Sequence, residues 1–199
     1  MPRPRLAVGL ASATVVAAIP LAVSAHQNLL DGLTFVLVAC ALAGVLGAAN
    51  WEGVEVSASF VCFMLAAVFL GPAAVFAIVI ATEIGAWIVL SRGWIKRRYR
   101  ARVLPINLAS IAVPALLAAH AFDALAGEMN GSAHDLAALA AVEIGFLALN
   151  FVLLRSLLAL LDGYHLSTVL EPPRALLPSL ALTVALTLAI VGVYTELGI

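Results

Sequence analysis

Long apolar runs with very few ionisable residues are the feature that most restricts how this chain can fold. Seven runs of 17 or more residues, rich in Ala, Leu and Val, follow one another. A helix needs about 20 residues to cross a bilayer core of about 30 Å, and about 17 at the least. Only 11% of the residues are charged, whereas soluble domains have about 25%, so a water-exposed surface is excluded. The runs are residues 6–24, 33–49, 54–70, 72–90, 106–122, 136–161 and 176–194.

The sequence therefore predicts an all-α fold, a polytopic transmembrane helical bundle that forms one domain over residues 1–199. The number of spans depends on Gly71 and Pro72, which separate the third run from the fourth. A glycine after one helix and a proline at the start of the next are typical of a tight helical hairpin. One kinked helix with a re-entrant start is the alternative, and it reduces seven spans to six. The hairpin is favoured, because 37 residues are too many for one span.

Basic residues are concentrated between the fourth and fifth runs, where six of the ten Lys and Arg residues lie within 13 positions. Four spans separate this basic segment from Arg3 and Arg5, so both stretches fall on one side. The positive-inside rule makes that side the cytoplasm. The basic segment is thus predicted to anchor the topology and to contact anionic lipid headgroups, with no role in nucleic-acid binding. It consists of Arg92, Lys96, Arg97, Arg98, Arg100 and Arg102.

The ends of the chain lead to two further expectations. The first run and the small residues at 23–25 resemble a signal peptide, but the run is longer than a usual signal core, so we expect no cleavage. With a cytoplasmic N-terminus and seven spans, the last run ends outside, five residues before the end of the sequence. We expect either an external C-terminus or the front part of a longer protein, in the bacterial cytoplasmic (inner) membrane.

Two oppositely charged residues, Glu83 and Arg155, lie inside predicted spans, where ionisable groups are costly and are functional candidates by default. Glu83 lies seven residues before the end of the fourth run, and Arg155 six residues before the end of the sixth. Both are then roughly 10 Å deep, so an ion pair between their helices is predicted. The pair is either a structural clamp or part of signalling or transport; snorkelling of each side chain to the interface is the alternative.

Three uncharged or weakly basic residues and one more carboxyl complete the polar candidates. Glu143 and Asn150 are seven residues apart and share a helical face, and Asn150 is expected to hydrogen-bond across helices. Asn107 starts the fifth run, where a helix cap is expected. His120 lies near the outer end of that run. With Glu143 it predicts an outward-open proton or ligand site; a buried, hydrogen-bonded carboxyl is the alternative.

No motif for catalysis, cofactor binding or metal binding is found in the sequence. The acidic and His residues of the outer loops have no metal-ligand spacing, and Asp135 is instead expected at the start of a helix. Cys40 and Cys62 lie in apolar runs, where they are interpreted as packing residues without a disulfide. Neither an enzyme, a cofactor nor a metal site is therefore expected.

Three stretches are similar to a known pattern. They are VSASFVCFMLAAVFLGPAAVFAIVIATEIG (56–85), RVLPINLASIAVPALLA (102–118) and FLALNFVLLRSLLALLDG (146–163). Their order and loop lengths resemble the N-terminal multi-span sensor region, the MASE-type domain, of bacterial HD-GYP and GGDEF signalling proteins. The resemblance covers residue 54 to the end and rests on Ser57, Ser59, Phe60, Gly71, Pro72, Asn107 and Asn150.

The resemblance implies a membrane-embedded sensory domain without catalytic activity of its own. It also implies one more span and a cytoplasmic cyclic-di-GMP domain beyond this chain, in cis or within a homodimer, besides membrane lipids as partners. The alternative is the small-solute-binding S-component of an energy-coupling-factor transporter, which the Gly-Pro hairpin and the small residues Ala7, Ala11 and Ala18 also resemble. An accessory membrane subunit without a ligand is the third interpretation.

Overall fold

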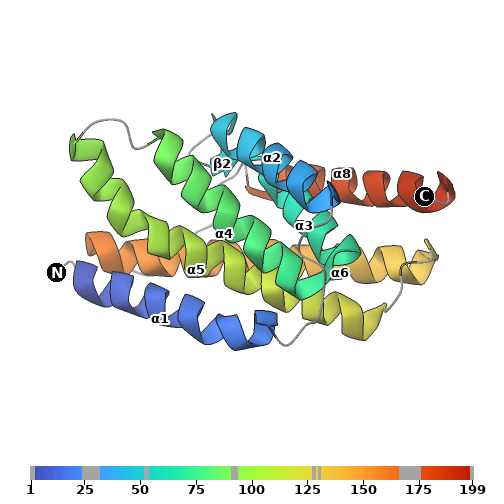
Figure 1. Cartoon of the computed structure of the whole chain (residues 1–199), viewed down its shortest axis with the longest axis horizontal. Coiled ribbons are helices and arrows are strands. Elements are labelled where there is room, and N and C mark those ends of the chain that lie inside the picture. The colour runs from blue at the N-terminus through green and yellow to red at the C-terminus, as the bar shows by residue number, and fades with distance from the viewer. Residues whose placement is uncertain are drawn as a thin grey trace.

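The computed structural model describes residues 3–23, 32–51, 54–90, 94–126, 129, 131–165 and 176–197, without the side chains of 49–56 and 94–100. These residues form seven helices and one two-stranded sheet (Figure 1). Five of the helices are long and apolar enough to cross a membrane. The predicted all-α transmembrane bundle is thereby confirmed. The elements are α1 (Pro4–Val23), α2 (Gly32–Leu46), β1 (Ala49–Trp51), β2 (Val54–Val56), α3 (Ser59–Phe69), α4 (Gly71–Leu90), α5 (Trp94–Leu125), α6 (Ala133–Asp162) and α8 (Leu176–Leu197).

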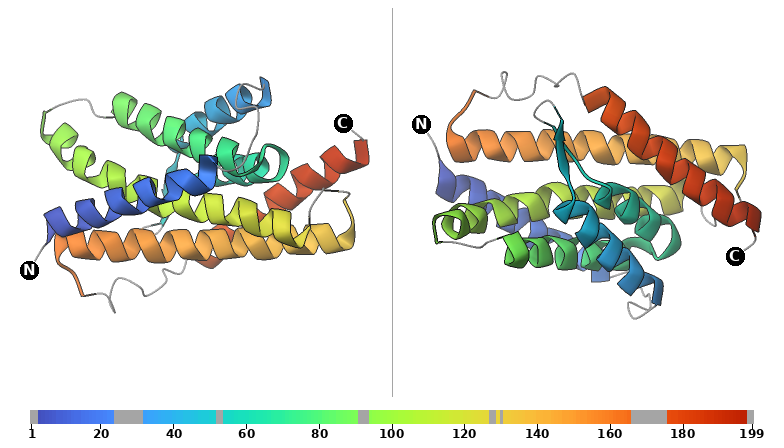
Figure 2. Two further views of the ribbon diagram at one scale, coloured as in Figure 1. Left: turned by 60° about the horizontal axis from the view of Figure 1, so that its bottom comes forward. Right: turned by 90° about the horizontal axis from the view of Figure 1, so that it is seen from above.

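Helix α5 is the centre of the bundle, because it packs against α1, α3, α4 and α6. Helix α8 packs mainly on α6 and α3 and lies at the edge of the molecule (Figure 2). The main core is built from large apolar side chains that are at most 1% exposed. Among them are Phe63, Met64, Ile78, Phe122 and Leu139.

Helix α1 approaches α5 and α6 through alanines, which let helices come close together in a membrane. Ala7 and Ala11 are fully buried in one cluster with Ile106 of α5. At the start of α1 the Arg3 amide donates a hydrogen bond to the Leu160 carbonyl of α6, at 2.9 Å. The N-terminal arginines therefore lie at the same end of the bundle as the start of the membrane-length part of α5, as predicted for the two basic stretches.

The predicted helical hairpin at Gly71 and Pro72 is confirmed. Helix α3 ends at Phe69 and is capped by Leu70, whose amide donates to the Ala66 carbonyl; α4 begins at Gly71. Gly71 has φ 78°, a left-handed conformation that is strained for residues with a β-carbon. Pro72 then occupies an early helical position, where no hydrogen-bond donor is needed. Helices α3 and α4 pack against each other.

The third predicted span is shorter than the expected run of 54–70. Residues Val54–Val56 form strand β2, which pairs antiparallel with β1, so α3 begins only at Ser59. Valines on both sides of Glu55 favour a strand over a helix start. Helix α3 has 11 residues and is about 16 Å long, roughly half of the hydrocarbon core. Helix α2 is also short, because it ends at Leu46 and not at residue 49.

Helix α5 is longer than the predicted run of 106–122. It begins at Trp94, contains Pro105 and Pro114, and has a membrane-length part at Ala101–Leu125. The basic segment therefore largely belongs to a helix and not to a loop. Arg92 lies outside the described residues, and Arg102 is exposed. The other four, Lys96, Arg97, Arg98 and Arg100, lie in the first turns of α5.

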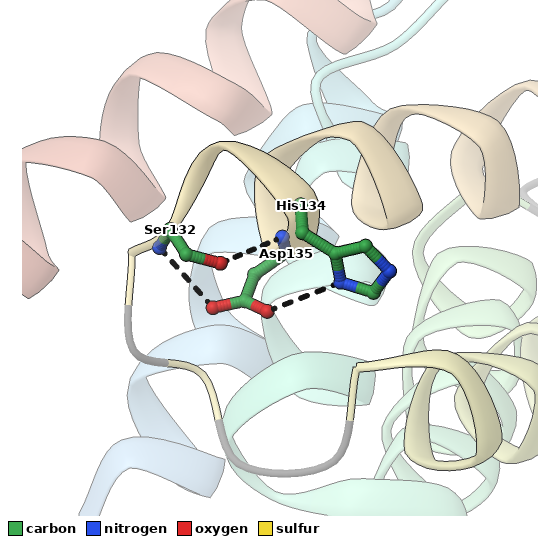
Figure 3. A network of polar contacts seen from close by, with 3 residues as sticks. All are labelled: Ser132, His134 and Asp135. Carbon is green, nitrogen blue, oxygen red and sulfur yellow. Dashed lines mark hydrogen bonds and ion pairs between the residues drawn. The ribbon is translucent and has the colours of Figure 1, made fainter.

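Helix α6 begins with a capping box, which confirms Asp135 as a helix-start residue (Figure 3). The Asp135 amide donates to Ser132 Oγ at 3.1 Å, and the Ser132 amide donates to Asp135 Oδ2 at 3.2 Å. These two bonds satisfy amides that have no partner within the helix. His134 Nδ1 lies 3.7 Å from Asp135 Oδ1, on an exposed ring.

Candidate functional site

A cavity of about 400 Å³ lies among α2, α3, α4, α5, α6 and α8. It is located towards the end of the bundle where α4 and α6 finish and the membrane-length part of α5 starts. Its polar wall is formed by Ser57, Ser59, Glu83, Asn107, Ser110, Asn150, Arg155, Ser179 and Thr183. Its apolar wall is formed by Val45, Phe60, Ile111, Leu147, Phe151, Leu154, Leu158, Leu176 and Leu180.

Four of the six polar candidates from the sequence line this cavity: Glu83, Asn107, Asn150 and Arg155. They come from α4, α5 and α6, which are far apart in sequence. Glu83, Asn107 and Arg155 lie at similar depths because each is six or seven residues from the same end of its membrane-spanning part, and Asn150 lies 12 residues from that end. Four of the sequence candidates therefore lie together at one cavity, although the sequence predicted other contacts among them.

Glu83 and Asn107 form a direct contact across α4 and α5. Asn107 Nδ2 donates to Glu83 Oε2 at 3.4 Å, and the Glu83 side chain is buried. Asn107 is not a helix cap, because α5 begins at Trp94, 13 residues earlier. Its amide instead helps to hold a buried carboxyl, which is costly in a membrane without a polar partner.

The predicted ion pair between Glu83 and Arg155 is not present among the described residues. Their helices α4 and α6 each pack against α5, so the two side chains reach the cavity from different walls. The guanidinium carbon of Arg155 lies 5.4 Å from the ring centroid of Phe151, one turn earlier in α6. This geometry is a cation–π contact, which stabilises the cation without neutralising it.

Asn150 forms the predicted interhelical hydrogen bond, and the structure explains why it is needed. Its Nδ2 donates to the Ser110 carbonyl of α5 at 2.8 Å. In a regular helix that carbonyl would accept from residue 114, which is a proline and has no N–H. Asn150 therefore satisfies a buried acceptor that Pro114 leaves open, as bilayer-embedded backbone requires.

Glu143 lies in a different environment, away from the cavity walls. Its side chain is fully buried, and Thr187 Oγ1 of α8 donates to its Oε1 at 2.8 Å. The other carboxyl oxygen has no partner within the described residues, and neither does the buried Nε2 of His120. No hydrogen bond between His120 and Glu143 is found among the described residues, and the outward-open proton or ligand site stays a prediction.

Four hydroxyl residues at these contacts were missed in the sequence, namely Ser110, Ser179, Thr183 and Thr187. Three of them occur at every fourth position of α8, a spacing that places them on one helical face. That regular spacing in the last apolar run was the signal that could have identified them. Among the described residues, no group of three or more His, Cys, Asp or Glu could hold a metal ion.

Comparison of the chain with protein-family models, curated proteins and solved structures gives no significant match. The similarity of residues 56–163 to MASE-type sensor regions therefore stays a prediction. The case for a function rests on the cavity and on the helices that enclose it.

Proposed function

We propose that the chain is the membrane-embedded sensory domain of a bacterial signal-transduction protein, and that it binds a small molecule in the cavity. The cavity is the observation that carries this proposal. A space of about 400 Å³ in which polar groups converge between apolar walls has the make-up of small-molecule sites. Helices packed for structure alone would be expected to fill such a space, because membrane helices associate through close packing.

Helix α8 is the element that would transmit binding. Ser179 and Thr183 of α8 line the cavity opposite residues of α6, and α8 packs mainly on α6 and α3. A ligand that contacts both α6 and α8 changes the stability of their packing and shifts the equilibrium between helix arrangements. The change would then pass to a cytoplasmic cyclic-di-GMP domain, in cis or within a homodimer.

The proposed orientation places the cavity end of the bundle at the cytoplasmic side of the inner membrane. The basic segment and the N-terminal arginines support this orientation, because they lie at the same end of the bundle as the cavity.

In a background without the two native cysteines, Tyr164→Cys should resist membrane-impermeant thiol reagents in intact cells. His134→Cys, at the other end of α6, should react. Both side chains are exposed, so the opposite labelling pattern would reverse the orientation.

One of the arguments for the transporter interpretation does not hold in the structure. Ala7, Ala11 and Ala18 of α1 were the small residues that could have met a partner subunit. All three are buried inside the chain, so this stripe is occupied by the bundle's own helices. The cavity remains compatible with a solute-binding subunit, and the experiment below separates the two functions.

The test uses the full-length gene product in cells and measures cyclic-di-GMP by mass spectrometry. Ser179→Leu places a larger side chain in the cavity without removing an interhelical hydrogen bond, because Ser179 Oγ donates within its own helix. Ala181→Leu, on the exposed face of α8, is the matched control. The cavity variant should change cyclic-di-GMP at least twofold at equal membrane abundance, and the control should not. An unchanged level with loss of solute uptake through an associated ATPase would instead establish the transporter.

A further inference from the structure

Arg155 of α6 places a positive charge in the wall of the cavity. Its side chain is partly buried, and no hydrogen bond or ion pair to its guanidinium is found in the part of the chain that the structure describes. Its described contact is the face of the Phe151 ring, at 5.4 Å from the ring centroid, which stabilises a cation but leaves its N–H groups unpaired. A cation inside a span is costly unless an anion compensates it. An anionic group of a ligand would provide that compensation.

The guanidinium of Arg155 is directed towards the middle of its helix and not towards the nearer end. Phe151 lies one turn closer to the start of α6, and long helical side chains lean in that direction. An arginine that snorkels to the interface would instead extend towards the helix end at Asp162. The contact with Phe151 therefore holds the positive charge beside the cavity.

Glu83, the acidic residue of the cavity, has a hydrogen-bond partner in the protein. It is 5% exposed, and Asn107 Nδ2 donates to its Oε2 at 3.4 Å. A carboxyl that is covered and hydrogen-bonded in this way presents no open charge to a ligand. The charge of the ligand is therefore inferred from Arg155 and not from Glu83.

The other polar groups of the cavity offer few hydrogen-bond donors. Ser110, Ser179 and Thr183 each donate to a carbonyl of their own helix, and a hydroxyl has only one proton. The Asn150 amide already donates to the Ser110 carbonyl. A phosphate group, with its three acceptor oxygens, would lack donors for some of them. A carboxylate has two oxygens, and the edge of the Arg155 guanidinium can bind both in bidentate geometry.

The rest of the cavity is apolar and has room for a chain of moderate length. Phe60, Leu147, Leu158 and Leu180 contribute apolar side chains from α3, α6 and α8, and these walls offer no hydrogen bonds to a sugar or a nucleotide. A volume of about 400 Å³ holds about 13 groups of the size of a water molecule, at about 30 Å³ each. Decanoate, a linear carboxylate with ten carbon atoms, has twelve non-hydrogen atoms and fits that volume.

We propose, on the basis of the small-molecule-binding function above, that the cavity binds a medium-chain fatty acid. The carboxylate lies on the edge of the Arg155 guanidinium, and the hydrocarbon chain lies along the apolar walls. A phospholipid also joins an anionic group to apolar chains, but its two acyl chains exceed the cavity and its phosphate needs more donors. The experiment therefore includes a lipid arm.

The first test measures binding to the purified chain in phosphatidylcholine nanodiscs, whose lipids have no net charge. Saturation binding of radiolabelled decanoate is measured at neutral pH, where the probe is ionised, and binding to empty nanodiscs is subtracted. The matched competitors are 1-decanol, which has the same chain without the charge, and decylammonium, which has the opposite charge. Both should compete about 10- to 100-fold more weakly than unlabelled decanoate, because each loses the charge-assisted contact.

The second test assigns the carboxylate to Arg155. Arg155→Gln should weaken decanoate about 10- to 100-fold and leave 1-decanol unchanged. Arg155→Lys keeps the charge but not the planar edge, so it should recover part of the loss. Arg102→Gln, at an exposed basic residue of α5, is the control and should alter neither probe. A gel-filtration profile equal to that of the wild type establishes that each variant is folded.

The third test separates the cavity from the bilayer as the place where the chain is bound. Each added methylene should strengthen binding about fourfold up to about ten carbon atoms, since it buries further apolar surface. Longer acids should gain no more affinity once the cavity is full, whereas partitioning into lipid continues to rise with chain length. Ser179→Leu reduces the space in the cavity, so it should move the limit to a shorter acid.

Three outcomes would overturn the assignment. One is that decanoate shows no saturable binding above empty nanodiscs. Another is that Arg155→Gln and the wild type bind decanoate equally. The third is that phosphatidylglycerol nanodiscs abolish decanoate binding through Arg155, which would make the cavity a site for a lipid phosphate. In each case a cyclic-di-GMP response to Ser179→Leu would still support the sensory function. If decanoate binds through Arg155 and that response is missing, the ligand class stands and the sensory function fails.

Discussion

The two halves of α6 place their polar residues in different surroundings. In the first half Glu143 is fully buried, and Thr187 of the neighbouring helix donates to one of its oxygens. In the second half Asn150 and Arg155 line a cavity together with residues of five other helices. The same helix therefore provides a closed polar contact at one depth and an open polar site at another.

Whether the surrounding helices close around a polar residue or leave space beside it indicates a structural or a ligand-binding role more clearly than the residue type does. A polar group in a membrane is costly at either depth. Where the helices close around it, a neighbouring side chain donates to one of its oxygens and the result is a helix–helix contact. Where they leave space, part of that capacity remains for a ligand. Glu143 belongs to the first case, and Arg155 belongs to the second.

The largest loss of stability is expected on truncation of an aromatic side chain in the closed core, compared with truncation of one at the cavity. Phe122→Ala should lower the free energy of unfolding by about 3–5 kcal/mol, because Phe122 is buried in the main core and its removal leaves a void. Phe151→Ala should cost about 1 kcal/mol, since this partly buried ring already borders an open space. Unfolding by SDS in mixed micelles measures both values.

Equal losses in the free energy of unfolding for Phe122→Ala and Phe151→Ala would contradict this expectation. They would mean that the cavity walls are packed as tightly as the core. Leu117→Ala, on the exposed face of α5, controls for the loss of a side chain that faces lipid and should have the smallest effect of the three.

The next prediction concerns whether the packing of α2 on α3 holds the cavity wall rigidly. Gly44 of α2 lies so close to α3 that a β-carbon there would be 2.7 Å from the Ser59 amide nitrogen. The backbone of α3 would have to shift to make room for this β-carbon, so Gly44→Ala should destabilise the protein by about 1–3 kcal/mol. Gly145→Ala is the matched control, because nothing lies within 4 Å of its added β-carbon. Equal stability of the two variants would mean that α2 can move away from α3.

The sequence predicted the fold well because apolar length and the Gly-Pro hairpin are local signals. The all-α bundle, the hairpin at Gly71 and the helix start at Asp135 all follow from a few adjacent residues. The failures occurred where tertiary structure decided. Residues 54–56 formed a strand in place of a helix start, and α5 continued through its prolines because neighbouring groups can satisfy the backbone that proline leaves open.

The candidate site was predicted in its membership but not in its contacts. The depth of a residue along its helix can be calculated from its residue number, and the calculated depths of Glu83 and Arg155 are similar. The angular position of each helix cannot be read in this way, so the presence of α5 between α4 and α6 was not foreseen. The contact of Thr187 with Glu143 was missed for the same reason, because nothing in the local sequence tells which helix Glu143 faces.

A double-mutant cycle tests the link between Asn150 and the proline of α5. Asn150→Ala leaves the Ser110 carbonyl without a donor and should cost about 1–2 kcal/mol. Pro114→Ala restores an N–H to that position, so it should recover part of the loss in the Asn150→Ala background. Additive effects of the two changes would mean that the carbonyl does not connect them.

The smallest effect concerns the closed contact itself. Thr187→Val keeps the shape of the side chain but removes the donor to Glu143 Oε1. Interhelical hydrogen bonds in membranes contribute about 0.6 kcal/mol on average and at most about 1.7 kcal/mol, so a loss in that range is expected from SDS unfolding. Glu143→Gln should cost less, because the amide oxygen can still accept from Thr187. Thr14→Val is the control, since Thr14 is only partly buried and donates to Leu10 of its own helix. Because Thr187 does not line the cavity, Thr187→Val should leave the cyclic-di-GMP level in cells unchanged. A change in that level would mean that the two halves of α6 act as one site, and the distinction between closed and open polar contacts would then be wrong.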